Sequence, residues 1–431
     1  MSKSQKIYLA SYLIIYAVLL SLLVVLQIKP ILSFTFIYIS ASVVYILICR
    51  QILKMEVPTN YIVVLLAISL VIKIIFIPLH PVGSDDYYRY VWDGKVQAHG
   101  INPYAYAPAD TSLNSLHTGI LPKLVNHPEM KTIYPPLTEI LFYFSYIIGG
   151  DSFSGLKILM LISDLLTLFG LYLILKRQNI PYKNILVYAL SPLIIFQLFI
   201  DAHADGFGLP FLIFSIFFYL DDQKLWSYVF LGLSLCIKPL GIIIIPIYFF
   251  SEKNFFSRIK SAVIPLLICG LFYLPYTFNG SPFQSLIEFT ENWTFNGIVF
   301  NILDFFIHNN QVSRIICSLL LLATYLPVVF SKKNLLDRIY LSIFLLFIFS
   351  PVVHPWYVVW LALLLPVIPR WSGILYTSLI SLTAFTVMNY QLTGVWKEYL
   401  LVQIFEYLPV ILFFIYELFK FREDKSISKI T

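Results

Sequence analysis

Long runs of apolar residues, separated by short polar segments, dominate the hydrophobic pattern of this chain. A helix needs about 20 mostly apolar residues to cross the hydrocarbon core of a bilayer. Windows of this kind lie at 7–28, 31–50, 60–78, 155–175, 312–331 and 400–420. The pattern therefore predicts an all-α polytopic membrane protein.

Shorter apolar runs predict further spans, several of them tilted or broken. They lie at 184–200, 206–220, 225–237, 239–250, 259–278, 337–350, 356–368 and 371–391. Together with the longer windows they predict one integral membrane domain, residues 1–431, with about 12–14 transmembrane helices.

The positions of Lys and Arg predict the orientation, because loops on the cytoplasmic side are enriched in both. With the N-terminus in the cytoplasm, the long loop 79–136 lies outside. If the short run 137–149 crossed the membrane, the basic turn 176–183 would face outward, so we expect 137–149 to lie along the interface. The large basic clusters and the C-terminus are then cytoplasmic, in a plasma or inner membrane.

The same topology brings four polar segments to the outer face. They are 79–136, 201–205, 277–300 and 351–357, and we expect them to line one cavity. The polar end of the chain, 421–431, is predicted to be a cytoplasmic tail, disordered over 422–431 because it has few residues to bury.

Composition supports a lipid environment and narrows the partners. Hydrophobic residues make up 59% of the chain and charged residues 12%, too few polar groups to cover a water-soluble globule. The net charge of +6 comes from residues in short loops that fix orientation, so no nucleic-acid partner is expected. The four cysteines stand singly in apolar stretches and are predicted to be core residues without a redox or metal role.

Candidate chemistry begins in the first outer loop. Asp85 and Asp86 follow the third span directly, where hydrocarbon neighbours would raise the pKa of both carboxyl groups and suit them to general-base catalysis. The residues from 87 to 96 are compatible with a short interfacial helix. In the alternative interpretation, one of the two aspartates caps that helix while Arg89 or Lys95 neutralises the other.

Other ionisable residues lie at span ends. Asp201, His203 and Asp205 form the sequence DAHAD, whose spacing does not put all three on one helical face, so a metal site is disfavoured. A cation at Lys238 or His354 could hold a phosphate oxyanion at the edge of the hydrocarbon.

Each of these residues also has a simpler interpretation. Lys238 could only snorkel towards water, and His127 could be a solvated loop residue. The aromatic residues after His354 fit the usual belt at a membrane interface: Trp356, Tyr357 and Trp360.

Several motifs together resemble a known family. The runs SDDYYRYVWDG at 84–94, INPYAYAP at 101–108, NHPEMKTIYPPL at 126–137 and HPWYVVW at 354–360 resemble polyprenyl-phosphate-sugar-dependent membrane glycosyltransferases with the GT-C fold, particularly bacterial polyprenol-phosphomannose-dependent mannosyltransferases. The first run also resembles the DxD-plus-NPY region of eukaryotic GPI-anchor mannosyltransferases. The motifs of nucleotide hydrolysis and serine hydrolysis are absent.

The resemblance implies a GT-C-like bundle with juxtamembrane helices in the first outer loop, and a specific reaction. A hexose, expected to be mannose, would pass with inversion from a polyprenyl-phosphate donor to a lipid-linked or envelope glycan acceptor outside the cytoplasm. Asp85 takes the place of the family's leading aspartate and is the expected base. The second aspartate of DxD would fall on Tyr87, which leaves the role of the adjacent Asp86 open.

The expected donor and phosphate residues are Arg89, Lys238, His354 and Tyr357, and the expected acceptor or pocket residues are Tyr88, His127, Tyr134 and His203. No soluble cofactor is expected. Metal independence is predicted because a monophosphate leaving group calls for a divalent cation less than a diphosphate does.

The rival class is a transporter or lipid flippase for envelope precursors, with Lys73, Lys238 and the 201–205 cluster along a midplane pathway. Polar groups gathered at one face favour the enzyme.

Overall fold

The computed structural model describes residues 3–26 and 30–427. Within these residues the regular secondary structure is all helical, joined by loops, and β pairing is limited to isolated bridges from Phe295 and Asn296 to Val352. The predicted all-α class is confirmed.

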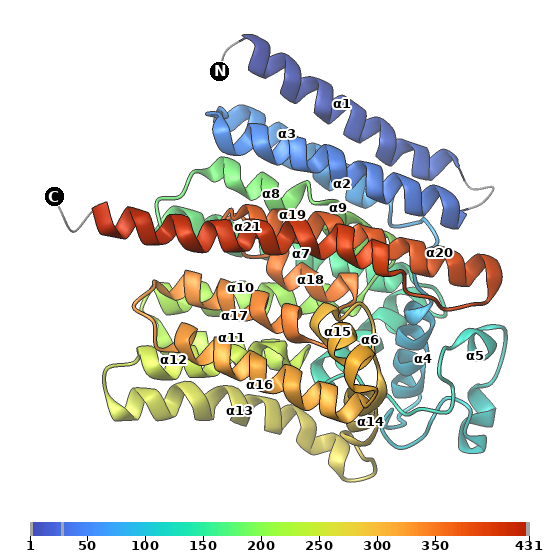
Figure 1. The fold of residues 1–431 in the computed structure, drawn as a ribbon. Coiled ribbons are helices and arrows are strands. Elements are labelled where there is room, and N and C mark those ends of the chain that lie inside the picture. Colours follow the sequence, from blue (N-terminus) through green and yellow to red (C-terminus); the bar gives the residue numbers. More distant parts are fainter. Residues whose placement is uncertain (1–2, 27–29, 428–431) are drawn as a thin grey trace.

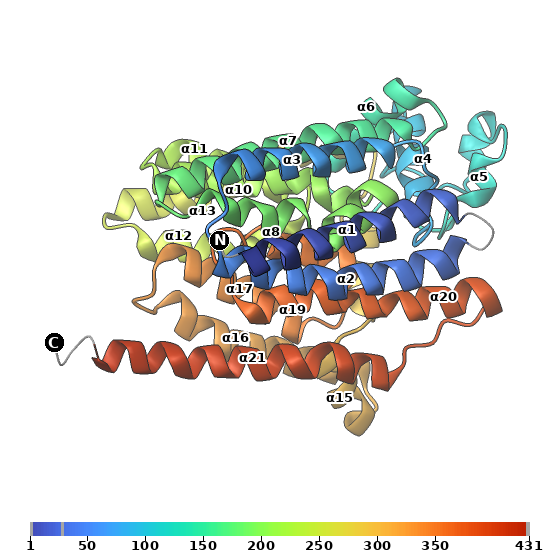
Figure 2. The same ribbon diagram turned by 90° about the horizontal axis from the view of Figure 1, so that it is seen from above.

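Long helices lie side by side and make up most of the molecule (Figures 1 and 2). They are α1 (Lys3–Val25), α2 (Pro30–Lys54), α3 (Thr59–Ile75), α7 (Ser154–Arg177), α13 (Phe255–Thr277), α16 (Asn310–Val329), α17 (Leu335–Phe349) and α21 (Leu400–Ile427). Their outward faces carry exposed Leu, Ile, Val and Phe side chains, such as Ile14, Leu267 and Leu319. Apolar surface of this extent indicates a lipid environment.

Shorter helices complete the bundle. They are α8 (Ile185–Ala189), α9 (Pro192–Ile194), α10 (Leu209–Leu220), α11 (Lys224–Leu235), α12 (Ile245–Ser251), α18 (Pro355–Ala362), α19 (Trp371–Leu379) and α20 (Ala384–Thr393). Segments of 3-10 or π geometry join them: η2 (Tyr182–Asn184), η3 (Ile195–Ile200), η4 (Ala204–Gly208), η5 (Pro239–Ile244) and η6 (Ile380–Thr383). Prolines in the first turn, such as Pro192, Pro239 and Pro355, explain several of these breaks, because proline begins a helix readily and interrupts one already formed.

Seven described helices are long and apolar enough to cross a membrane. An eighth results if Tyr182–Ala189 and Pro192–Ile200, bent by 46°, form one broken span. Further expected spans correspond to shorter apolar helices, including α3 and α10. The polytopic class is confirmed, and the larger number of spans stays a prediction.

The remaining helices gather with α20 at the right-hand end of Figure 1. They are α4 (Asp86–Ala98), η1 (Thr111–Leu116), α5 (Leu121–Leu124), α6 (Pro136–Gly149), α14 (Gln284–Asn292) and α15 (Ile298–Ile307). The helices expected near 87–96 and 137–149 are therefore present. At about 1.5 Å per residue, the 14 residues of α6 reach only about 21 Å, less than a bilayer's hydrocarbon core. α6 packs against α4 and α7, and its position at the interface stays a prediction.

One expectation about the C-terminal tail is wrong. α21 continues without interruption to Ile427, so residues 422–427 are helical instead of disordered. The last four residues of the expected tail, 428–431, lie outside the described residues.

Candidate active site

A cavity of about 1430 Å³ lies at the end of the bundle where α4 and α14 meet the long helices. Its walls come mainly from segments 80–89, 125–135, 201–205, 237–240, 286–295 and 350–357. All four polar segments expected at the outer face therefore contribute, and the prediction that they line one cavity is confirmed.

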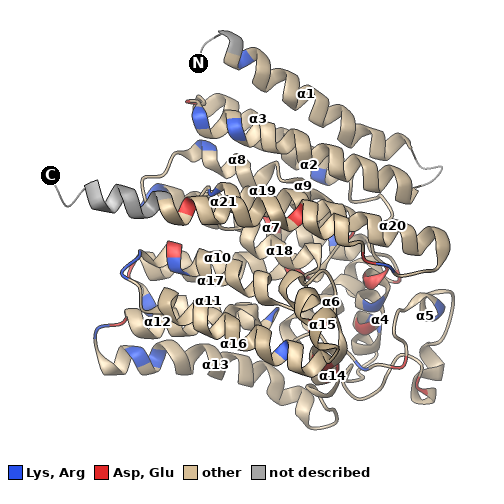
Figure 3. Cartoon of the chain, in the orientation of Figure 1, with Lys and Arg blue, Asp and Glu red and all other residues tan. Residues whose placement is uncertain are grey.

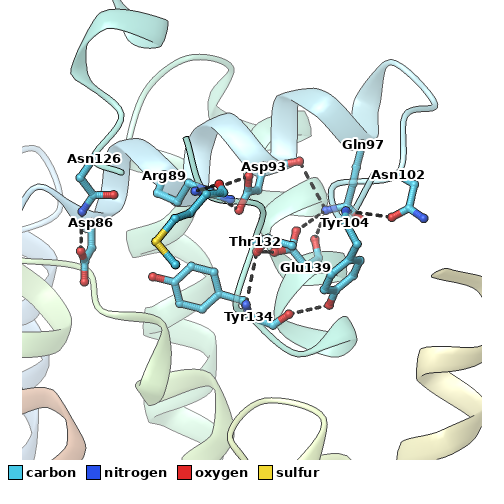
Figure 4. A network of polar contacts seen from close by, with 11 residues as sticks. Asp86, Arg89, Asp93, Gln97, Asn102, Tyr104, Asn126, Thr132, Tyr134 and Glu139 are labelled. Atoms are coloured by element: carbon cyan, nitrogen blue, oxygen red, sulfur yellow. Dashed lines mark hydrogen bonds and ion pairs between the residues drawn. The ribbon is translucent and has the colours of Figure 1, made fainter. Parts of the chain in front are cut away.

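The two adjacent aspartates occupy different environments. Asp85 is exposed at the N-cap position of α4, whereas the Asp86 side chain keeps only 22% of its surface open. The Asn126 side-chain amide donates hydrogen bonds to Asp86 Oδ1 at 2.8 Å and to Asp85 Oδ1 at 3.2 Å (Figure 4 shows the bond to Asp86). Neither carboxylate is neutralised by Arg89 or Lys95, which pair with Asp93 and Asp151, and the Asp85 side chain makes no capping bond.

Burial, and after it the charge of Asp85, raise the pKa of Asp86 to about 6 against the opposing effects of Asn126 and Lys238. A carboxyl group with such a pKa is mainly ionised at neutral pH, yet binds a proton more readily than an ordinary aspartate. This property suits a general base.

Lys238 is held from two sides. Its Nζ lies 3.3 Å from Asp205 Oδ1 and 3.6 Å from the centre of the Tyr357 ring. Asp205 also accepts a hydrogen bond of 3.1 Å from Trp360 Nε1, so a buried partner fixes the carboxylate that holds the lysine. A quarter of the Lys238 side chain stays open to the cavity, where it places a positive charge.

Four rings stack against one another beside this lysine. His203 stacks on Trp356 at 3.7 Å, Trp356 on His354 at 4.3 Å, and His354 on Phe295 at 4.6 Å. Burial and the charge of Lys238 lower the pKa of His354 to about 3, so its neutral ring would meet a phosphate by hydrogen bonding. His203 also has a pKa well below its usual value, and its Nδ1 lies 3.8 Å from Asp86 Oδ2.

His203 is completely buried and does not line the cavity, whereas Tyr88, Tyr134 and His127 do. The ring of Tyr88 packs at a tilt against that of Tyr87, and Tyr134 meets the ring of Tyr90 edge-on at 5.1 Å. His127 is half exposed and meets the ring of Trp293 edge-on at 4.9 Å.

Arg89 serves largely to hold the protein together. Its Nε lies 2.9 Å from both Asp93 carboxylate oxygens, and its Nη1 donates to the carbonyl of Met130 (Figure 4). Its Nη2 meets no hydrogen-bond partner among the described residues. The sequence suggested that the Arg89 guanidinium would bind a phosphate, but its positive charge is paired with the buried Asp93 carboxylate.

Three further residues shape the site, although sequence reasoning gave them no such role. Asn126 binds both aspartates, and Asp205 holds Lys238. Asp201 accepts hydrogen bonds from the backbone N–H groups of Val82 and Gly83, which anchors the loop before Asp85. Asn126 lies in the NHPEMK run, and Asp201 and Asp205 lie in DAHAD. Each residue was therefore part of a polar motif visible in the sequence.

No group of three or more metal-ligating side chains comes together among the described residues. The three polar residues of DAHAD have different partners: Asp201 binds the backbone of Gly83, His203 stacks on Trp356, and Asp205 pairs with Lys238.

The fold and this cavity define a polytopic, all-helical membrane protein with an acidic site and a lysine at one end of its bundle. Residues 39–251 match the model of the family described as alpha-(1->6)-mannopyranosyltransferase, N-terminal domain. This part of the chain, just under half of its length, therefore matches a domain of a mannosyltransferase family. No curated protein matches the chain significantly.

Proposed function

We propose that the protein transfers mannose from a polyprenyl-phosphate donor to a hydroxyl group of a lipid-linked or envelope glycan, on the extracytoplasmic face of the membrane. The observation that carries this proposal is the meeting of Asp86, Lys238 and His354 at one cavity, in a chain that matches a domain of a mannosyltransferase family. Such a cavity offers a base and a phosphate-binding cation together.

The proposed reaction is a single in-line displacement. The acceptor oxygen attacks the anomeric carbon while a carboxylate takes the hydroxyl proton, the bond from that carbon to the phosphate oxygen breaks, and polyprenyl phosphate leaves with the electron pair. Inversion of a β-linked donor would give an α-linked product, in agreement with the linkage in the family's description. The donor's own phosphate serves as leaving group, so no nucleotide is needed.

Of the two aspartates, Asp86 is better suited to be the base. The sequence resemblance favours Asp85, but that side chain is exposed, whereas Asp86 is largely enclosed and has a raised pKa. Asn126 would keep the pair oriented by binding both. Asp85 would act mainly by raising the pKa of its neighbour.

The donor phosphate would lie against Lys238, with His354 as a neutral hydrogen-bonding partner and Tyr357 beneath the ammonium group. Arg89 would contribute by holding the loop at Met130, which lines the same cavity. The acceptor glycan would contact the rings of Tyr88, His127 and Tyr134, which line the same cavity. His203 is completely buried and would act behind this surface, through its contacts with Trp356 and Asp86.

The distribution of charge supports the proposed orientation. Figure 3 shows many Lys and Arg residues at the left-hand end of the long helices, opposite the end that carries α4 and α14. By the positive-inside tendency, the basic end faces the cytoplasm and the cavity faces outward. Both α1, where it begins, and α21, where it ends, lie towards the basic end (Figure 1).

The test compares donors in an assay with purified protein in EDTA. We expect label to pass from polyprenyl-phosphate mannose to a glycan acceptor and none to pass from GDP-mannose, because a cavity beside long apolar helices suits a donor that has a lipid tail. Transfer from GDP-mannose, or loss of activity in EDTA that Mn²⁺ restores, would contradict the donor class or the metal independence respectively.

A further inference from the structure

The first turn of α6 contacts the segment that carries Lys238. The backbone N–H groups of Leu137 and Thr138 both lie within hydrogen-bond distance of the Cys236 carbonyl, at 3.1 and 3.4 Å. The Thr138 hydroxyl donates a hydrogen bond of 3.0 Å to the carbonyl of Ile237, the residue before Lys238. The start of this helix therefore holds the chain that delivers the lysine to the cavity.

Glu139, the next residue of the same turn, contacts a different part of the site, namely Thr132 and the helix α4. Glu139 is completely buried, and its Oε1 accepts a hydrogen bond of 2.5 Å from the Thr132 hydroxyl. Gln97 Nε2 donates to Glu139 Oε2 at 2.9 Å and to the Glu139 backbone carbonyl at 2.7 Å (Figure 4). Gln97 belongs to α4, the helix that begins at Asp86.

We infer that Thr138 and Glu139 are positioning residues that fix the spacing between Asp86 on α4 and Lys238 after α11. Consecutive residues of an α-helix point about 100° apart, so one rigid turn can bind two neighbours in different directions. The inference rests on the proposed roles of Asp86 as base and Lys238 as phosphate cation.

The spacing matters because the base and the phosphate cation act on opposite sides of the anomeric carbon in a displacement. A misplacement of about 1 Å can lower a rate about a hundredfold even when no reacting group is lost. Glu139 does not line the cavity, so it would act only through the helices and segments that it joins.

The buried, hydrogen-bonded environment of Glu139 guides the choice of variants. Burial raises the pKa of this carboxyl group well above its usual range, and the neighbouring Asp93 raises it further. Glutamine has nearly the same size as this side chain and keeps one acceptor oxygen for the bonds at this position, so Glu139→Gln is the conservative variant.

The first measurement is steady-state mannose transfer by Thr138→Val, Thr138→Ser, Glu139→Ala and Glu139→Gln. The control is Thr167→Val, which removes an equally buried hydroxyl that bonds the Ser163 carbonyl within α7. We expect Thr138→Val and Glu139→Ala to lower kcat about tenfold or more with KM for the donor little changed. Thr138→Ser and Glu139→Gln should retain most of the wild-type kcat, and Thr167→Val should be unaffected.

The second measurement does not depend on activity. Hydrogen–deuterium exchange in nanodiscs should become faster in peptides covering 236–240 for Thr138→Val and should stay at the wild-type rate for Thr167→Val. Wild-type exchange and wild-type kcat in Thr138→Val would overturn the inference. Faster exchange in that variant, with no mannose transfer by the wild type, would overturn the proposed function while supporting the coupling through α6.

Discussion

At the scale of single residues, the site separates two neighbouring carboxyl groups by burial. Asp85 remains at the exposed N-cap of α4, and Asp86, one position further, turns towards His203 and Tyr90. Burial removes water from the Asp86 carboxyl group and raises its pKa, whereas the Asp85 side chain stays in contact with solvent. Adjacent acids in a sequence do not reveal which one is enclosed.

This separation predicts the pH dependence of transfer. Because the pKa of Asp86 is about 6 and the carboxylate is the active form, kcat/KM should fall as the pH drops through about 6. Asp85→Asn removes a charge that raises this pKa, so the acidic limb should move to lower pH. Rates measured from pH 4.5 to 8 test this, and an acidic limb that Asp85→Asn leaves in place would contradict it.

The sequence located most residues of the candidate site but not their partners. Asp86, Lys238 and His354 could be singled out because ionisable groups are costly beside hydrocarbon. The pairings of Lys238 with Asp205 and of Arg89 with Asp93 depend on which helices meet, and the sequence pattern carries no such information.

At the scale of elements, one ion pair joins two long helices without lining the cavity. Lys73 on α3 lies 2.7 Å from Asp164 on α7, and both side chains are almost completely enclosed. The sequence suggested Lys73 for a transport pathway, but its charge is matched within the bundle. Removing one partner of such a pair leaves the other charge buried, which typically costs about 3–5 kcal/mol.

We therefore expect Lys73→Met to lower the apparent Tm in detergent clearly, and the double variant Lys73→Met/Asp164→Leu to recover most of that loss. The recovery follows because the second substitution removes the stranded carboxylate. Thermal unfolding monitored by intrinsic fluorescence would measure both. A double variant no more stable than Lys73→Met would show that the stranded carboxylate is not the cause.

The elements themselves were largely predictable. Apolar run lengths predicted the long helices to within a few residues, and the charge pattern predicted the short helix at 137–149. The break near Pro239 was predicted, as the boundary between the spans expected at 225–237 and 239–250. The bend before Pro192 and the helical continuation of α21 through 422–427 were not predicted, because the length of an apolar run does not show where a helix bends or how far it extends into polar sequence.

At the scale of the whole molecule, the chain gathers polar residues from four distant segments at one end of an apolar bundle. A transporter would be expected to concentrate such groups at mid-bilayer. The long apolar helices beside a wet cavity suit a substrate that has a lipid tail and a sugar head. Together with the mannosyltransferase family match, this arrangement supports the enzyme.

The most direct test is transfer of radiolabelled mannose from polyprenyl-phosphate mannose by wild type, Asp85→Asn and Asp86→Asn, reconstituted in proteoliposomes in equal, correctly folded amounts. The account predicts transfer by the wild type, a fall of about 10²–10⁴-fold in Asp86→Asn, and measurable transfer by Asp85→Asn. Wild-type protein that transfers no mannose, or Asp86→Asn that transfers it at the wild-type rate, would contradict the account.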